Sequence, residues 1–182
     1  DIVVQQDNSG KTGFIHAYLN KREDIVEALL NLPNNEEMLN VSFQGSCKMG
    51  HYGVVELLLK QANSQEIISS KDQQGENGFM KACQIGQYEV VALLLKHPNI
   101  AEIINEKDKT GSTGYMKACL MPSIEVMTLI HEHTTDPIER EDLYNVFKSL
   151  CKSYSTESKK LLMEETKKWR IVLEFILTKY DF

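Results

Sequence analysis

The sequence has no apolar run of roughly 18 residues and no signal-like stretch at its N-terminus. These absences predict no membrane span and no membrane partner. The chain starts at Asp1 without an initiator Met, so we expect a fragment, and a targeting segment could have been lost with the true start. Basic residues are in the minority. The net charge is −6, which argues against a nucleic-acid partner because phosphate binding needs a basic surface.

Catalytic signatures are absent as well. The chain has no G-x-S-x-G elbow, no P-loop, no paired-carboxylate constellation and no ordered Cys–His pair. His131 and His133 resemble a fragment of a metal motif, but side chains two positions apart on a helix point about 200° apart and cannot share one ion. We therefore predict a protein that is not an enzyme and has no catalytic residue, no metal site and no cofactor.

What the chain does contain is an internal repeat. Residues 78–83 (GFMKAC) and 114–119 (GYMKAC) match each other 36 positions apart, and two earlier copies can be aligned with them. An aromatic anchor and a valine-type anchor recur with the same steps of 29, 36 and 36 residues. The anchors are Phe14, Phe43, Phe79 and Tyr115, and Ile25, Val54, Val90 and Val126. A period in the thirties is typical of stacked helical hairpins, each of which needs its neighbours to bury its apolar face.

Each repeat is predicted to be a turn followed by two short helices. Asn77 suits the N-cap of a helix over 78–85, and Gly86 suits the left-handed residue that closes it. A second helix over 88–96 carries a broad apolar face, and Pro98 ends it. Both helices are shorter than the roughly 12 to 15 residues that an isolated helix needs in water. Their order must therefore come from stacking into an all-α solenoid.

This unit resembles the ankyrin repeat. Residues 72–95 read D-x-x-G-x-N-G-F-M-K-A-C-x-x-G-x-x-x-V-V-x-L-L-L, and the family pattern is D-x-x-G-x-T-P-L-H-x-A-A-x-x-G-H-x-x-V-V-x-L-L-L. The resemblance covers residues 7 to 133. It implies a single domain, 1–182, that is an ankyrin-like helical-hairpin solenoid with short β-hairpin or turn fingers. The expected repeats are 7–40, 41–70, 71–106 and 107–135.

The chain departs from the family pattern at several slots. Glycine replaces the family's proline before the aromatic anchor in three copies, at Gly13, Gly78 and Gly114. Because glycine raises the entropy cost of ordering the corner, we expect softer corners, with the large aromatics filling the leucine slot. Lys21 and Pro122 replace the closing glycine in the first and fourth copies, where we expect local distortion.

The first step of the repeat is seven residues shorter than the others. Between Asn40 and Phe43 stand only Val41 and Ser42, so the turn that resembles the family's finger is absent. Either this repeat lacks a finger, or seven residues of a mobile hairpin are missing from the sequence.

The spacing also breaks near the C-terminus. Asp136, Pro137 and Glu139 predict the start of a helix, and a longer helix is expected over about 156–179. We interpret residues 136–180 as a divergent final repeat whose helices cap the solenoid. The alternative is a docking helix that binds another protein through Trp169.

Three of the four cysteines, Cys47, Cys83 and Cys119, share one repeat slot. Packed helices lie about 8 to 10 Å apart, beyond the roughly 7 Å limit between the Cα atoms of a disulfide. We therefore expect buried, reduced thiols, and also a buried Cys151. Reduced thiols favour an intracellular, cytoplasmic location and leave nuclear entry open.

The resemblance implies that the finger tips and the exposed side of each first helix line a concave groove. Mapping each slot onto the repeats predicts the partner-binding residues Asn8, Ser9, Lys11, Leu19, Asn20, Lys48, Met49, Gln73, Gln74, Glu76, Gln84, Ile85, Lys109, Thr110, Ser112, Leu120 and Met121. The apolar members would form a strip beside polar fingers, which suits a protein partner. The alternative is that Met49 and Ile85 tuck between repeats.

These observations predict a monomeric, non-enzymatic interaction module that binds another protein through the groove. The alternative is an inhibitory or regulatory ankyrin protein that masks an enzyme or a transcription factor.

Overall fold

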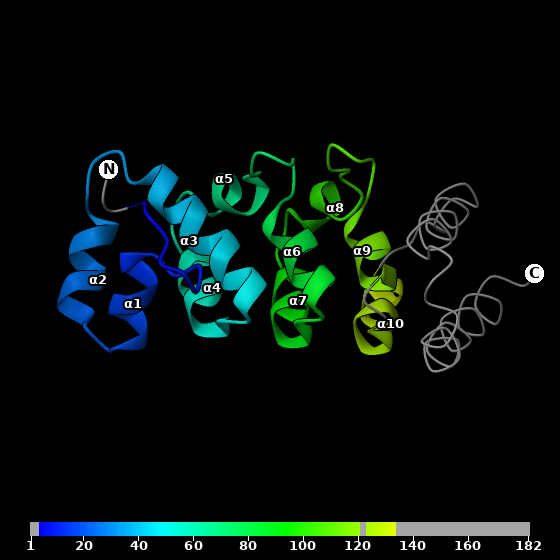
Figure 1. The fold of residues 1–182 in the computed structure, drawn as a ribbon, viewed down its shortest axis with the longest axis horizontal. Helices are drawn as coiled ribbons and strands as arrows, with labels where there is room; N and C mark the ends of the chain where they lie inside the picture. The colour runs from blue at the N-terminus through cyan, green and yellow to red at the C-terminus, as the bar shows by residue number, and fades with distance from the viewer. Residues whose placement is uncertain (1–3, 121–122, 134–182) are drawn as a thin grey trace, which may run out of the picture.

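The structure is a computed structural model that describes residues 4–120 and 123–133, and the helices predicted at 136–180 lie outside this range. The described residues form a row of helical hairpins that stand side by side (Figure 1). Within these residues, β pairing is limited to one isolated antiparallel bridge between Lys71 and Asn77. The predicted all-α hairpin solenoid is confirmed.

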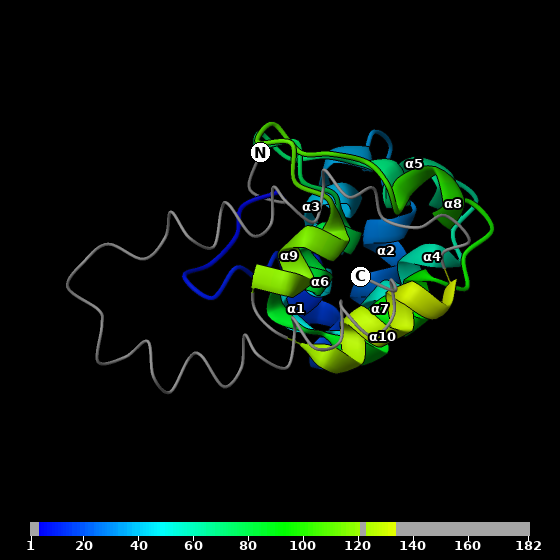
Figure 2. The ribbon, with the colours of Figure 1, turned by 90° about the vertical axis from the view of Figure 1, so that its right-hand side faces the viewer.

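Seen from the end of the row, the first helices of the hairpins lie in one layer and the second helices in another (Figure 2). The first helices are α1 (Gly13–Leu19), α3 (Glu36–Met49), α6 (Gly78–Ile85) and α9 (Gly114–Leu120). The second helices are α2 (Glu23–Leu30), α4 (Tyr52–Leu59), α7 (Tyr88–Leu94) and α10 (Ile124–His133). Two short helices, α5 (Ser64–Ser69) and α8 (Ile100–Ile103), lie in the linkers. Helix α6 packs between α3 and α9, so each hairpin is held by its neighbours.

The helix-end signals act as predicted in the third repeat. The Asn77 side chain accepts a hydrogen bond of 2.9 Å from the Met80 amide at the start of α6. Gly86 closes the helix with a φ of +80°, a left-handed conformation that glycine adopts without a steric penalty. Residues adjacent in sequence thus decide where α6 begins and ends.

Two helix ends differ in detail from the simple pattern. Helix α7 ends at Leu94, two residues before the predicted end, because the Lys96 and His97 amides bond to carbonyls three residues back instead of four. In the first repeat, Lys21 replaces the closing glycine and adopts a left-handed φ of +56°. This is the local distortion expected there, whereas Pro122 lies outside the described residues.

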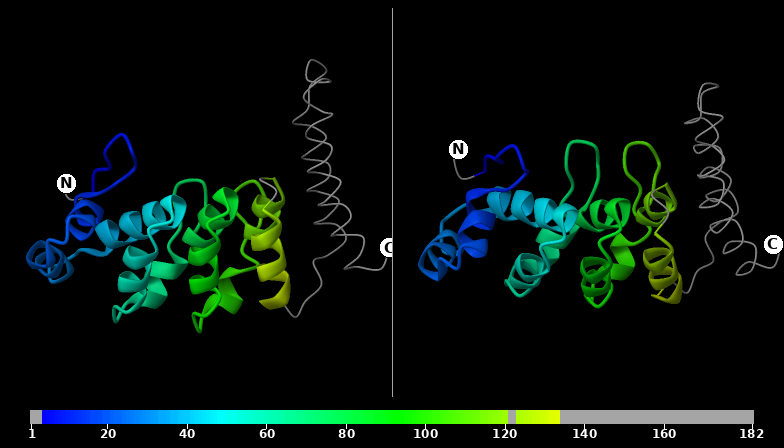
Figure 3. Two further views of the ribbon diagram at one scale, coloured as in Figure 1. Left: turned by 90° about the horizontal axis from the view of Figure 1, so that it is seen from below. Right: turned by 60° about the horizontal axis from the view of Figure 1, so that its bottom comes forward.

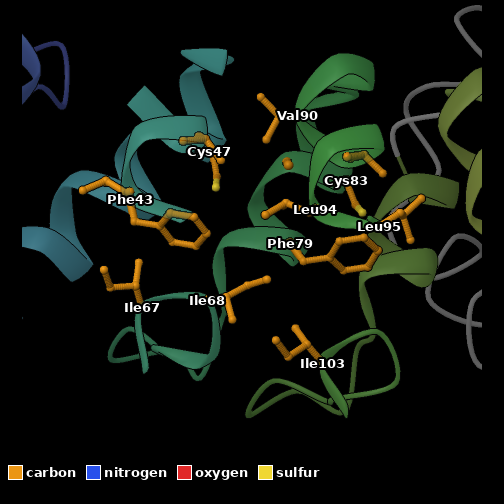
Figure 4. Packing of buried hydrophobic residues seen from close by; sticks show 14 of the residues in the cluster. Phe43, Cys47, Ile67, Ile68, Phe79, Cys83, Val90, Leu94, Leu95 and Ile103 are labelled. Atoms are coloured by element: carbon orange, nitrogen blue, oxygen red, sulfur yellow. The ribbon is translucent and has the colours of Figure 1, made fainter. Parts of the chain in front are cut away.

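The buried apolar residues of the described part of the chain form one continuous cluster, part of which is shown in Figure 4. All four aromatic anchors are buried in it. Cys47, Cys83 and Cys119 are buried and form no disulfide, as predicted, while Cys151 lies outside the described residues. Figure 4 shows Cys47 and Cys83 at corresponding places in successive hairpins.

The shortened first step of the repeat produces one long helix. Helix α3 runs through the expected boundary at residues 40 and 41, so the linker of the first repeat and the first helix of the second are continuous. In the third and fourth repeats a loop separates these two segments. The second repeat therefore begins without a finger.

Candidate partner-binding face

Three fingers of the same construction project from the repeats (Figure 3). They are the Asp7 finger (residues 7–11), the Asp72 finger (72–76) and the Asp108 finger (108–112). In each finger, Oδ1 of the aspartate accepts hydrogen bonds of 2.8 to 3.0 Å from the amides two and four positions later. The glycine three positions after the aspartate has a φ of +79 to +82°. The pattern D-x-x-G thus builds the same turn three times.

The Asp72 and Asp108 fingers contact one another. The Lys109 amide donates a hydrogen bond of 3.0 Å to the Gln74 carbonyl. A Cβ built on Gly75 would lie only 3.2 Å from the Lys109 nitrogen. Adjacent fingers therefore form a close-packed pair.

A series of ion pairs joins these two fingers to the first helices. On α6, Lys81 Nζ lies 2.5 Å from Asp72 Oδ2 and 3.8 Å from Glu76 Oε2. On α9, Lys117 Nζ lies 2.5 Å from Glu76 Oε1 and 2.8 Å from Asp108 Oδ2. Each lysine binds the aspartate of its own finger, and Glu76 reaches across to the lysine of the next repeat. We call these five residues the ion ladder.

Pairing keeps the ion ladder charged despite its burial. Only 3% of the Asp108 side chain and 9% of the Lys117 side chain are exposed. Desolvation alone raises the pKa of Asp108, but hydrogen bonds from Lys117 and from the Asp108 finger outweigh it and bring the pKa to about 2. The pKa of Asp72 is lowered through the same balance, with Lys81 as the main hydrogen-bond donor. For Lys117, desolvation lowers the pKa, and the bonds to Asp108 and Glu76 raise it by more.

The first repeat carries a related pair. His16 occupies the same slot as the two lysines, and its Nε2 lies 2.7 Å from Asp7 Oδ2. Hydrogen bonds from the Lys11 amide, the Ser9 hydroxyl and His16 lower the pKa of Asp7 far below its usual range. Asp7 is therefore an ionised and already occupied acceptor at neutral pH.

Gly10 and Gly45 mark the place where the second repeat lacks its finger. A Cβ built on Gly75 would touch the following finger, but a Cβ built on Gly10 would have no atom within 4 Å, because no finger follows the Asp7 finger in the second repeat. On α3, Gly45 stands in the slot that carries histidine or lysine in the other repeats. A Cβ on Gly45 would lie 3.1 Å from the Gly10 carbonyl oxygen, so the Asp7 finger leans against α3.

The missing finger and the glycine at position 45 belong together. In the other repeats the histidine or lysine in this slot binds the aspartate of its own finger, so a repeat without the aspartate offers no such contact. A side chain at position 45 would also press on the Asp7 finger. Gly45 and its contact with the Asp7 finger thus fit a second repeat that has no finger of its own.

The gap forms a cleft of about 590 Å³. The Asp7 and Asp72 fingers are its walls and α3 is its floor. The lining residues are Gln6, Asp7, Asn8, Ser9, Gly10, Val41, Gln44, Gly45, Lys48, Met49, Asp72, Gln73, Gln74 and Lys81. Lys48 is exposed and forms no ion pair with any residue that the structure describes, so its charge is available to a ligand.

Exposed apolar side chains gather at the turns that join first to second helices. Leu19 and Ile85 end α1 and α6 and are 44% and 48% exposed. Tyr52 and Tyr88 begin α4 and α7 and are 43% and 45% exposed. We call these four residues the apolar edge. Its members recur at the same turn in successive repeats.

The predicted binding residues fall into three groups. Six of them line the cleft, namely Asn8, Ser9, Lys48, Met49, Gln73 and Gln74. Others lie elsewhere on the fingers and first helices, namely Lys11, Leu19, Asn20, Glu76, Gln84, Ile85, Lys109, Thr110 and Ser112. The side chains of Leu120 and Met121 lie outside the described residues. Ile85 is exposed and does not tuck between repeats, whereas Met49 packs partly buried against the core.

Sequence reasoning missed part of this face. It did not select Lys81, Gln44 or Gly45 for the cleft, or the two tyrosines of the apolar edge. The seven-residue deficit was the available signal for the cleft, because a repeat without a finger leaves an open place between its neighbours. The recurrence of tyrosine two positions after a closing glycine was the signal for the edge.

The buried cysteines are held as neutral thiols in the folded protein. Desolvation raises the pKa of Cys47 and Cys83 well above the usual value and that of Cys119 to about 12, which keeps these thiols protonated. Across residues 4–120 and 123–133, no group of three or more His, Cys, Asp or Glu could hold a metal ion. The same part of the chain contains no helix with the length and apolar character needed to cross a membrane.

A comparison with known families finds a match to a family model described as ankyrin repeats (3 copies), over residues 43–141. The match spans more than half of the chain and includes the second repeat, which lacks a finger. A comparison with the curated proteins finds no match.

Proposed function

Because the chain belongs to the ankyrin repeat family, we propose that it binds a partner protein across its fingers and first helices. Ankyrin repeats are general protein–protein interaction modules, so the family supplies the class of function. The face that does the binding is the more specific part of the proposal. It extends from the finger tips to the apolar edge.

The observation that carries this proposal is the exposed apolar edge. Ile85 and Tyr88 leave nearly half of their surface in solvent, although the same sequence buries every aromatic anchor. Tyrosine is enriched where proteins bind one another, because it combines a large contact area with a polar group. The polar finger tips at the other border of this face would supply the hydrogen-bonding rim.

The test is to identify a partner by affinity capture and then to measure its affinity for variants. The double variant Gln84→Arg, Ile85→Glu places two charges on the proposed face. Leu32→Glu is the matched control, because Leu32 is 41% exposed but follows α2, away from the apolar edge. We expect the double variant to weaken binding by about 2 kcal/mol or more and the control to bind normally. Equal binding by the parent chain, the double variant and the Leu32→Glu control would refute the proposed face.

The same purified partner distinguishes a scaffold from an inhibitor. An adaptor leaves the partner's own activity intact at saturation, whereas an inhibitory protein abolishes it on titration. We favour the adaptor.

We also propose that the module is a monomer in the cytoplasm. The reduced, buried thiols support this compartment, because disulfides are rare in the cytosol. Sedimentation equilibrium of the full chain tests the oligomeric state, and a mass that rises with concentration would contradict a monomer.

A further inference from the structure

The cleft lies where the stack of fingers is interrupted. The Asp72 finger has the Asp108 finger on one side and an open space on the other. On the closed side, the Lys109 amide donates to the Gln74 carbonyl, and Glu76 reaches the lysine of the next repeat. These two contacts define what a finger offers to its successor, namely a backbone acceptor and a carboxylate.

The corresponding groups beside the cleft lack these contacts. Gln73 holds the same position in the Asp72 finger as Lys109 holds in the Asp108 finger. The backbone amide of Gln73 donates a hydrogen bond to no residue that the structure describes. Lys81 occupies the place of Lys117, but among the described residues both carboxylates paired with it, those of Asp72 and Glu76, belong to its own finger. Lys117 has two carboxylates within 3 Å, one of them from the preceding finger.

The lysines that line the cleft can bind an acidic ligand. Asp72 is paired with Lys81, and Asp7 already accepts hydrogen bonds from His16 and from its own finger. Lys48 is unpaired among the described residues, and the Lys81 ammonium has hydrogen-bond donors left, because only one carboxylate lies within hydrogen-bonding distance. The open flank of Gly10 leaves room for a backbone to lie against the Asp7 finger.

From this arrangement we propose that the cleft binds a polar turn of the partner protein that takes the place of the missing finger. A carboxylate of the partner's turn binds Lys81, in the way that Glu76 binds Lys117. A backbone carbonyl of the same turn accepts a hydrogen bond from the Gln73 backbone amide, in the way that the Gln74 carbonyl accepts one from the Lys109 amide. Lys48 at the rim adds attraction for the same acidic segment. This inference rests on the proposed function and specifies the chemistry of the partner segment.

The chain's own finger supplies a probe for the test. A peptide with the sequence of residues 71–77, closed by a disulfide between two added terminal cysteines, presents the turn and a carboxylate at the position of Glu76. Its binding to the full 182-residue chain is followed by NMR chemical shifts at millimolar peptide. We expect saturable shifts at Gln73, Gln44 and Lys48, and about tenfold weaker binding by the peptide with Glu76→Gln.

Variants of the protein locate the binding. Lys81→Met and Lys48→Glu are each expected to weaken binding about tenfold. Lys96→Glu is the matched control for Lys48→Glu, because both lysines are exposed and the charge change is the same, but Lys96 follows α7 and lies outside the cleft. This control is expected to bind the peptide like the parent chain. Lys48→Glu is fully informative even if Lys81→Met fails to fold, because Lys48 makes no ion pair within the described residues.

Several outcomes would overturn the proposal. These are absence of shifts at millimolar peptide, equal binding of the Glu76→Gln peptide, and shifts confined to the Asp108 finger. Self-association through the same residues, lost in Lys81→Met, would assign the cleft to a second copy of the chain instead. If the captured partner depends on Ile85 but not on Lys81 or Lys48, this inference fails while the proposed function stands. If the peptide binds the cleft but the captured partner does not depend on Ile85, this inference stands and the proposed binding face fails.

Discussion

The ring of Phe43 fills the space that a side chain on Gly78 would need. A Cβ built on Gly78 would lie 2.6 Å from Phe43 Cε1 and 2.9 Å from Cys47 Sγ. The next pair of repeats reproduces the contact, because a Cβ on Gly114 would lie 2.6 Å from Cε1 of Phe79. The aromatic anchor of one repeat thus packs directly against the glycine of the following one.

This contact accounts for three departures from the family pattern at once. Where the pattern has leucine and alanine, this chain has the larger phenylalanine and cysteine, and where it has proline, this chain has glycine. Volume added on one side of the junction is removed on the other, which keeps the interior close-packed. The glycine that the sequence alone predicts as an entropic weakness is therefore also a packing requirement.

Gly78→Ala should destabilise the protein. The new methyl group would press on a fully buried ring, and we expect a loss of about 1 to 3 kcal/mol in the free energy of unfolding. Chemical denaturation monitored by circular dichroism measures this loss. Gly13→Ala is the matched control, because Gly13 holds the same slot in the first repeat and a Cβ there would meet nothing within 4 Å.

Gly13→Ala should be neutral or stabilising by up to about 1 kcal/mol, since alanine lowers the entropy of the unfolded chain. Adding Phe43→Leu and Cys47→Ala to Gly78→Ala should restore much of the lost stability by removing both clashing groups. If Gly78→Ala is as stable as Gly13→Ala, the packing explanation is wrong.

Lys117→Met should be strongly destabilising, because it leaves the carboxylates of Glu76 and Asp108 without their shared cation. Removing one partner from a buried ion pair costs about 3 kcal/mol or more. Lys60→Met removes a lysine from the exposed pair with Glu56 and should cost about 0.5 kcal/mol or less. Similar unfolding midpoints for the two variants would show that the ion ladder contributes little.

Asp108 should make stability depend on pH in the acid range. Its pKa is about 2 in the folded protein and 3.8 in the reference state, so the stabilisation is complete above pH 4 and is lost as the pH falls towards 2. Asp108→Asn keeps an acceptor oxygen for the finger but removes the charge. The variant should be less stable than the parent chain by about 2 kcal/mol at pH 7 and nearly equal to it at pH 2. Thermal unfolding of both proteins between pH 7 and pH 2 measures the gap, and a gap of constant size would contradict this assignment.

The three buried thiols should resist alkylation in the native state. Cys47, Cys83 and Cys119 are fully buried and have raised pKa values, so a thiolate-directed reagent needs the repeat to open first. Mass spectrometry after timed exposure to iodoacetamide should show labelling of these residues only on the timescale of unfolding, and fast labelling in denaturant. Rapid native labelling of Cys83 would place it outside the core.

For much of the candidate binding face, the sequence identified only the equivalent positions in successive repeats and not how those positions are arranged in space. The D-x-x-G pattern identified each finger, because the aspartate and the glycine that build the turn are neighbours along the chain. Which finger residues face the cleft depended on the Asp7 finger leaning onto Gly45, a contact between residues more than 30 positions apart. No local pattern reports such a contact.

By itself, the sequence determined the hairpin repeat, the ends of α6 and the burial of Cys47, Cys83 and Cys119 in the last three repeats, because caps, turns and apolar periodicity act between residues a few positions apart. Only the tertiary structure decided that Gly78 must lack a side chain, that Glu76 serves the lysine of the next repeat, and that a missing finger leaves a cleft lined by Lys48 and Lys81. These features arise where one repeat meets another, and their energies depend on distances that exist only once the repeats are stacked.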